Sequence, residues 1–157
     1  MTREPLDVGD KAPAFTLPDA GGGKTTLKSF AGKKLVLYFY PKDDTPGCTK
    51  EAIDFSGLRA SFEKAGTVVA GVSPDSCTSH AKFAKKHHLG VTLLADETKA
   101  MLEAYGVWTE KSLYGRKYMG VERTTFLIGS DGRIARVWRK VKVPGHAEEV
   151  LEAAKAL

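Results

Sequence analysis

The sequence predicts an α/β fold in which a mixed central sheet is flanked by helices, with an N-terminal β-hairpin extension. Residues 34–40, KLVLYFY, form a nearly continuous apolar run, which is typical of a strand covered on both faces. Strand-like and helix-like segments then alternate as far as residue 105, and two further strands and a helix end the chain. Alternating segments favour parallel strands joined by helices, and the late strand pair adds antiparallel ones.

The N-terminal hairpin is centred on residues 18–25, PDAGGGKT. Its glycines favour a flexible turn between two short strands. The stretch nearly matches a phosphate-binding loop, but Pro18 replaces the first glycine and the residues that follow do not predict a helix. Because the helix N-terminus is the part that binds phosphate, we expect a turn here and no nucleotide.

A helix is predicted over residues 48–64, after the first long strand. Ala52, Phe55 and Phe62 follow Cys48 at offsets of four, seven and fourteen residues, so the thiol shares their inward face. The order β-α-β-α followed by β-β-α is typical of a thioredoxin-like fold, here one domain over residues 1–157. The other predicted elements are strands at 67–72, 91–94, 124–128 and 134–138, and helices at about 76–88, 96–105 and 147–157.

The composition is that of a globular protein whose 24 Lys and Arg exceed 19 Asp and Glu, for a net charge of +5. The densest basic stretch, residues 133–142, alternates apolar and basic side chains, which favours a charged edge strand over a nucleic-acid site. No apolar run is long enough to span a membrane. The N-terminal residues lack the apolar core of a secretory signal, and we therefore expect a cytoplasmic protein.

The loop before the predicted helix is built to place one thiol. Pro41 ends the strand, and Pro46 and Gly47 immediately precede Cys48. Proline fixes φ and glycine tolerates unusual angles, so the two can aim backbone donors. A helix N-terminus favours the thiolate over the thiol. Thr45 adds a hydroxyl that can hydrogen-bond a bound polar group.

These residues resemble the peroxiredoxin active-site signature, P-x-x-x-T-x-x-C, which here is Pro41, Thr45 and Cys48 in YPKDDTPGCTKE. The form TPGCT-x-E resembles the bacterioferritin comigratory protein (Q-type) subfamily. The similarity extends over almost the whole chain, through GDKAPAFTLPD, GVSPDS and YGVWTEKSLYGRKYMGVERTTFLI.

The resemblance implies a thiol-dependent peroxidase without a metal or organic cofactor. Cys48 would attack a hydroperoxide and become a sulfenic acid, which thioredoxin or a similar reductant would recycle. The resemblance also places Arg123 beside the thiol. Without the resemblance, an arginine next to an apolar run has two explanations. Its guanidinium pairs with a thiolate, or it extends into water from the end of the strand. Charge on the departing oxygen would be stabilised by Arg123, Thr45 and the Cys48 backbone N–H. Relatives of this subfamily imply a monomer.

The sequence offers two routes by which the sulfenic acid is resolved. Many relatives carry a second cysteine five residues after the first, where this chain has Ile53, and others carry it at the position of Ala84. This chain has Cys77 instead, about 10 Å further back along the same helix. Cys77 either forms a disulfide with Cys48, aided by a helix-start position that would make it thiolate-like, or is passive while an external thiol reduces Cys48. A disulfide would require the first turn of the Cys48 helix to unwind.

Two alternative functions differ from a peroxidase in the residues that they need. A thiol–disulfide oxidoreductase needs C-x-x-C, and the three residues after Cys48 are Thr-Lys-Glu. A binding protein would use the basic edge strand, with Arg136 and Arg139, as a docking face for the reductant.

A metal site was the remaining alternative. Cys77, His80, His87 and His88 lie close together in the sequence, but their spacing fits no structural zinc pattern. We therefore expect no metal.

Overall fold

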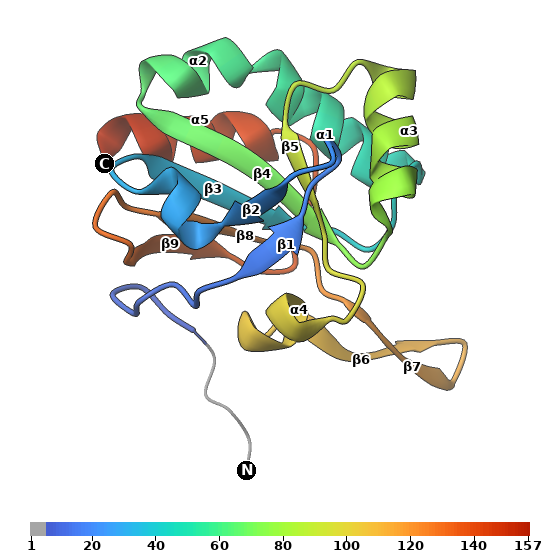
Figure 1. The fold of residues 1–157 in the computed structure, drawn as a ribbon. Helices are drawn as coiled ribbons and strands as arrows, with labels where there is room; N and C mark the ends of the chain where they lie inside the picture. Colours follow the sequence, from blue (N-terminus) through green and yellow to red (C-terminus); the bar gives the residue numbers. More distant parts are fainter. Residues whose placement is uncertain (1–5) are drawn as a thin grey trace.

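The computed structural model describes residues 6–157 (Figure 1). Its centre is a five-stranded sheet with the strand order β5-β4-β3-β8-β9. Three strands are parallel, while β8 runs antiparallel to β3 and β9 antiparallel to β8. The sheet is therefore mixed, as predicted. The strands are β3 (Lys34–Phe39), β4 (Thr67–Ser73), β5 (Thr92–Ala95), β8 (Thr124–Ile128) and β9 (Ile134–Trp138).

One face of the sheet is covered by four helices (Figure 1). Val36 and Tyr38 of β3 point to this face, where they pack with Phe55, Phe62 and Phe83. Burial of these large apolar side chains stabilises the layer. The helices are α1 (Pro46–Gly57), α2 (Arg59–Lys64), α3 (Cys77–His87) and α5 (His146–Ala156).

The other face carries the N-terminal hairpin and a short helix. Leu35, Leu37 and Phe39 of β3 point to this side and pack with Phe15 and Leu102. Alternate residues of β3 thus feed two separate cores, and the apolar run at 34–40 is covered on both faces as predicted. The elements here are β1 (Thr16–Pro18), β2 (Lys24–Thr26), the 3-10 helix η1 (Leu27–Phe30) and α4 (Ala100–Ala104).

Two predicted helices differ in extent. The helix expected at 48–64 is two helices that meet at Leu58, whose backbone N–H turns to the Phe55 carbonyl at 3.1 Å. Gly57 ends the first helix, consistent with the low helix propensity of glycine. The helix expected from residue 96 begins only at Ala100, because residues 96–99 form a turn in which Lys99 has a φ of +67°.

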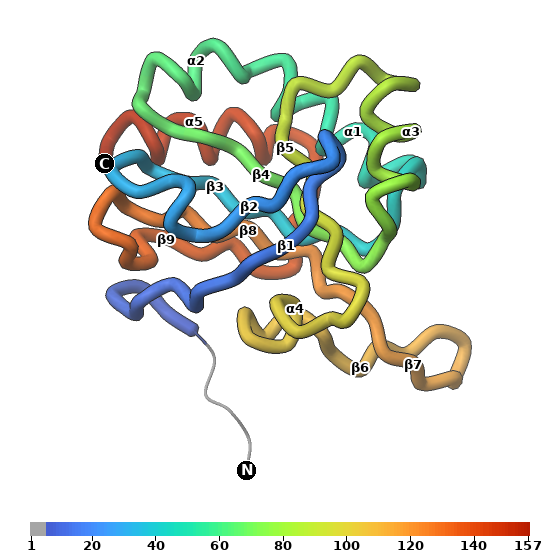
Figure 2. The backbone as a smooth tube through the Cα atoms, viewed as in Figure 1, coloured from blue at the N-terminus to red at the C-terminus, as the bar shows by residue number. Residues whose placement is uncertain are grey.

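A third hairpin was not predicted. β6 (Trp108–Leu113) pairs with β7 (Arg116–Val121) and extends away from the central sheet (Figure 2). Its side chains are mostly exposed, so the strands lack the alternation of apolar and polar residues that marks a half-buried strand. The two-residue turn, Tyr114-Gly115, has positive φ at both positions. Such turns usually carry Asn or Asp first, and the tyrosine concealed the signal.

The basic stretch at 133–142 begins in an edge strand, as expected. Residues 9–12 cover part of that edge, with hydrogen bonds from the Gly9 N–H to the Ile134 carbonyl at 2.8 Å and from the Ile134 N–H to the Asp10 carbonyl at 2.9 Å. Further along, the Arg136 guanidinium lies 4.7 Å from the centre of the Trp138 ring. Among residues 6–157, no helix is long and apolar enough to cross a membrane.

Candidate active site

The site lies at one edge of the sheet, where the strand directions bring distant segments together. β3 and β4 are parallel, so the loops that lead from them to α1 and α3 leave from the same edge. β8 is antiparallel to β3 and pairs its first residue, Thr124, with Phe39, the last residue of β3. Arg123, immediately before β8, is therefore brought to the start of α1.

Cys48 is the third residue of α1 and is only 1% exposed. Arg123 Nη2 donates a hydrogen bond to the Cys48 Sγ at 3.3 Å. The approach depends on Gly47, because a Cβ at that position would lie 3.2 Å from Arg123 Nη2. The predicted pair of Cys48 and Arg123 is thus in contact, with the guanidinium beside the sulfur.

Thr45 and Pro41 shape the loop that carries the thiol. Thr45 is the N-cap residue of α1, yet its side chain makes no capping bond. The hydroxyl instead donates to the Lys42 carbonyl at 2.9 Å, so in this geometry its oxygen is left as an acceptor for a bound O–H. Pro41 follows the last strand-like hydrogen bond, from the Tyr40 N–H to the Val72 carbonyl at 3.0 Å, and has no N–H to continue the ladder.

Glu51 is a site residue to which the sequence analysis assigned no role. Its Oε1 accepts a hydrogen bond from Arg123 Nη1 at 2.7 Å, so the guanidinium bridges the carboxyl and the thiol. Burial raises the pKa of Glu51 to about 7, against the opposing charge of Arg123. The carboxyl belongs to the TPGCT-x-E motif, three residues after Cys48 on one helix face, and that spacing was the available signal.

The floor of the site is aromatic. The Tyr38 ring stacks on Phe55 at 4.8 Å between ring centres, and the Tyr38 hydroxyl is buried without a hydrogen-bond partner. Burial, followed by the nearby Glu51 carboxyl, raises the pKa of Tyr38 well above its usual value. Room for the phenol comes from Gly71 on β4, where a Cβ would lie 2.6 Å from the Tyr38 ring.

Cys77 is the first residue of α3 and is partly exposed, and both cysteines are free thiols. The expectation that its helix-start position would make it thiolate-like is wrong in direction. Partial burial, then the negative charges of Glu97 and Asp19, raise the pKa of the Cys77 thiol. These two carboxyls lie near β5, beyond β4 as seen from β3.

The histidines proposed as an alternative metal set are dispersed. His80 is fully buried, His87 contacts Asp44 at the surface at 2.9 Å, and His88 is an exposed C-cap. Within residues 6–157, the one group of three His, Cys, Asp or Glu side chains close enough to share an ion is Asp43, Asp75 and His80. Its atoms already hydrogen-bond one another or nearby hydroxyls and backbone N–H groups, so the arrangement fits a hydrogen-bond network better than a metal centre.

Comparison with known proteins agrees with the geometry. The AhpC/TSA family matches residues 8–137. A putative peroxiredoxin bcp of Coxiella burnetii is 52% identical over 146 residues, covering 93% of this chain and 97% of the relative. Peroxiredoxin Bcp of Bacillus subtilis is 47% identical, covering 96% of both.

Solved structures give the same result. The bacterioferritin comigratory protein of Xanthomonas campestris, described for its alkyl peroxide reduction activity, superimposes with a TM-score of 0.90 at 45% identity, covering 96% of this chain and 98% of that one. PrxQ of Xylella fastidiosa superimposes with a TM-score of 0.93 at 41% identity, covering 98% of both. The chain therefore belongs to the AhpC/TSA family of peroxiredoxins, and it is a thiol-dependent peroxidase.

Proposed function

We propose that Cys48 is the peroxidatic residue and that Arg123, Thr45 and Pro41 complete its site. The observation that carries this proposal is the Arg123 guanidinium, which contacts the Cys48 Sγ at 3.3 Å and is held by Glu51 at 2.7 Å. The Cys48 thiolate attacks the terminal oxygen of R–O–O–H, an S–O bond forms as the O–O bond breaks, and R–O⁻ leaves and takes a proton. Cys48 is left as a sulfenic acid.

Each neighbouring group has a place in that step. The free lone pairs of the Thr45 oxygen accept the O–H of the hydroperoxide and orient it. The Arg123 N–H groups and the Cys48 backbone N–H face the charge that develops on the leaving oxygen. Pro41 holds the loop that carries these donors. Since the positions are set before the substrate binds, little reorganisation accompanies the reaction.

We infer that the substrates include hydrogen peroxide and organic hydroperoxides. A shallow hollow beside the first turns of α1 is bordered by Pro46, Thr49 and Ile53, and Ile53 is 45% exposed. Its rim is completed by Asp44, Lys50, Asp54 and His87. An organic substituent would therefore find apolar contact at Pro46 and Ile53. The reported alkyl peroxide activity of the Xanthomonas campestris relative is in line with this substrate class.

For the return step, we propose that Cys77 resolves the sulfenic acid. The Cys77 thiol attacks the sulfenic sulfur of Cys48, and a disulfide and water are formed. In support, α1 and α3 begin at the same edge of the sheet, and the sequence has two cysteines, Cys48 and Cys77. A dithiol reductant of the thioredoxin type would then return both thiols. We also propose a monomer in the cytoplasm, where free cysteines persist; gel filtration and cell fractionation test these two points.

The proposal is tested by weighing the intact protein after one equivalent of hydrogen peroxide. We expect the wild type to lose two hydrogens, Cys77→Ser to gain one oxygen, and Cys48→Ser to remain unchanged within the same interval. Gain of one oxygen in the wild type would instead assign a one-cysteine enzyme that an external thiol reduces. A rapid reaction that survives Cys48→Ser would overturn the role of Cys48.

A further inference from the structure

A network of buried polar side chains lies beside the site and takes no part in the chemistry proposed above. The Asp43 carboxylate accepts hydrogen bonds from the Tyr40 hydroxyl at 2.6 Å and the Ser79 hydroxyl at 2.7 Å. It also contacts His80 Nδ1 at 2.7 Å, and Asp43 and His80 are 7% and 0% exposed. Because water barely reaches these groups, they are satisfied by one another and not by solvent.

Both nitrogens of the His80 ring have a partner inside the protein. His80 Nε2 lies 2.9 Å from the Leu94 carbonyl, which can only accept, so Nε2 carries a proton. Nδ1 faces the Asp43 carboxylate at 2.7 Å. Burial disfavours the charged form of Asp43, but the hydrogen bonds from His80, Tyr40 and Ser79 outweigh it and lower the pKa of this carboxyl. Asp43 is therefore a buried carboxylate that its neighbours stabilise by hydrogen bonds.

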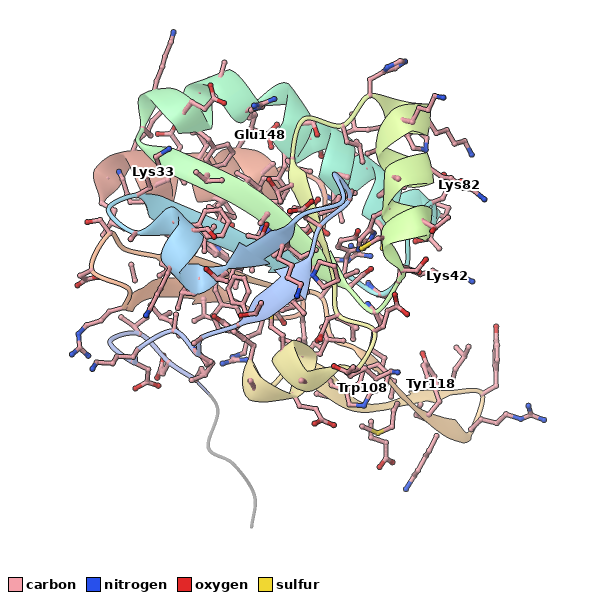
Figure 3. The ribbon with its side chains drawn as sticks, in the orientation of Figure 1. Lys33, Lys42, Lys82, Trp108, Tyr118 and Glu148 are labelled. Atoms are coloured by element: carbon pink, nitrogen blue, oxygen red, sulfur yellow. The ribbon has the colours of Figure 1, made fainter. Side chains whose placement is uncertain are left out.

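The network joins the loop that leads to Cys48 to the start of α3. The Asp43 backbone N–H donates to Asp75 Oδ2 at 2.8 Å, which ties the loop after β3 to the loop after β4. Lys42 immediately precedes Asp43, and Lys82 lies two residues after His80. Figure 3 shows both lysines on the same side of the molecule. We call this set the latch; its members are Tyr40, Asp43, Asp75, Ser79 and His80.

The catalytic cycle requires this region to open. The Cys48 side chain is 1% exposed, and a thiol that attacks its sulfenic sulfur must reach that sulfur directly. The first turn of α1 therefore has to move outward, and the segment that connects it to the sheet is the one that the latch holds. A second tether, from Asp44 to Lys86 at 2.7 Å and to His87 at 2.9 Å, lies at the exposed surface, where ion pairs contribute little.

We propose that the latch controls the opening of the Cys48 loop: closed, it holds the thiolate beside Arg123 for attack on peroxide, and its rupture exposes Cys48 to the resolving thiol. Asp43 and His80 are thus positioning residues that act through the loop. Loss of a partner leaves a buried polar group without its hydrogen bond, which weakens the closed state. While the closed state still predominates, peroxide attack changes little and every step that needs the open state accelerates.

The test is the rate at which a bulky maleimide labels Cys48 in the reduced protein, with Cys77→Ser as the background so that only one thiol remains. We expect Asp43→Asn to label at least about tenfold faster, given the cost of an unmet buried hydrogen bond. Asp44→Asn is the matched control, one residue away at the exposed tether, and should change labelling less than about twofold. Ser79→Ala is measured too, as a milder variant for the case in which Asp43→Asn does not fold; it removes one donor to Asp43 and leaves the contact of Asp43 with His80 in place.

Two results would overturn the latch. One is equal labelling rates in the Asp43→Asn, Ser79→Ala and Asp44→Asn variants. The other is labelling whose urea dependence equals that of global unfolding, because the variants would then have weakened the whole domain and not the loop. Single-turnover oxidation by peroxide in the same variants should stay within about twofold of the parent while the closed state predominates.

In an Asp43→Asn variant that keeps Cys77, we also expect the Cys48–Cys77 disulfide to form faster. This expectation alone rests on the proposed resolving role of Cys77. The two proposals fail separately. A parent protein that does not react with peroxide at Cys48 contradicts the proposed function, whereas maleimide labelling reports on the latch without any turnover.

Discussion

The buried carboxyl of Glu51 makes stability depend on pH, and the substitution Glu51→Gln isolates that dependence. Gln keeps the size of the side chain and an oxygen that can accept from Arg123, but it does not titrate. In the folded protein burial raises the pKa of Glu51 to about 7, from an ordinary value of 4.5. Between these two values the folded protein binds more protons at this carboxyl than the unfolded chain does. The free energy of unfolding therefore falls as the pH rises through this window.

The size of the effect follows from the two pKa values. From pH 5 to pH 8, the wild type should lose about 2 kcal/mol of stability relative to Glu51→Gln. A constant offset between the two proteins, from the altered contact with Arg123, is expected and does not enter the comparison. Most of the loss lies below pH 7, and the two curves run parallel above about pH 8.

The assay is urea unfolding of both proteins, kept reduced, at pH 5, 6, 7 and 8. The m value is the slope of the unfolding free energy against urea concentration. A pH dependence of this slope would signal a change in the unfolded state and is checked in the same data. If the difference in unfolding free energy between the two proteins is the same at pH 5 and pH 8, Glu51 does not titrate in this window. Burial would then not outweigh the ion pair with Arg123 in setting the pKa of Glu51.

Three further substitutions test the site. Arg123→Lys replaces a fork that reaches both the thiol and Glu51 by a point charge, and peroxide attack in stopped flow should slow about a hundredfold; a rate within threefold of wild type would contradict the bridging role. Gly47→Ala places a Cβ 3.2 Å from Arg123 Nη2, so attack should slow about tenfold while the melting temperature changes by no more than about 3 °C; unchanged kinetics would show that the guanidinium does not need this space. Tyr38→Phe removes a buried hydroxyl that has no partner, and urea unfolding should show equal or greater stability, by up to about 1 kcal/mol; a clear loss of stability would reveal a hydrogen bond that this geometry lacks.

The hairpin of β6 and β7 shows a limit of prediction from sequence. Trp108 and Tyr118 both belong to this hairpin (Figure 3), but Tyr118 is 47% exposed and Met119 is 50% exposed. Alternation of apolar and polar residues predicts a strand only where one face is buried against a core, and most of this hairpin has no such face. Its existence depends on backbone pairing and on a turn with two positive φ angles, which the residues themselves signal weakly.

The thiol environment shows a second limit. A helix start predicts a lower thiol pKa, and that local rule applies equally to Cys48 and Cys77. The surroundings of the two thiols differ in the structure: Arg123 contacts the first thiol, whereas Glu97 and Asp19 lie near the second and raise the pKa of Cys77. All three of these charged groups are distant in sequence from the thiol that they affect, and so local patterns do not contain the answer.

The sequence by itself determined the α/β class, the strand that feeds two cores and the loop that places Cys48, because apolar periodicity, proline and glycine act over a few residues. The resemblance placed Arg123 beside the thiol, but only the tertiary structure decided how the charges of the site meet. The antiparallel direction of β8 brings Arg123 to Cys48 and Glu51, and the parallel pair β3 and β4 brings the loop of Asp43 to His80. Such contacts follow from the order and direction of strands, which many distant side chains set together.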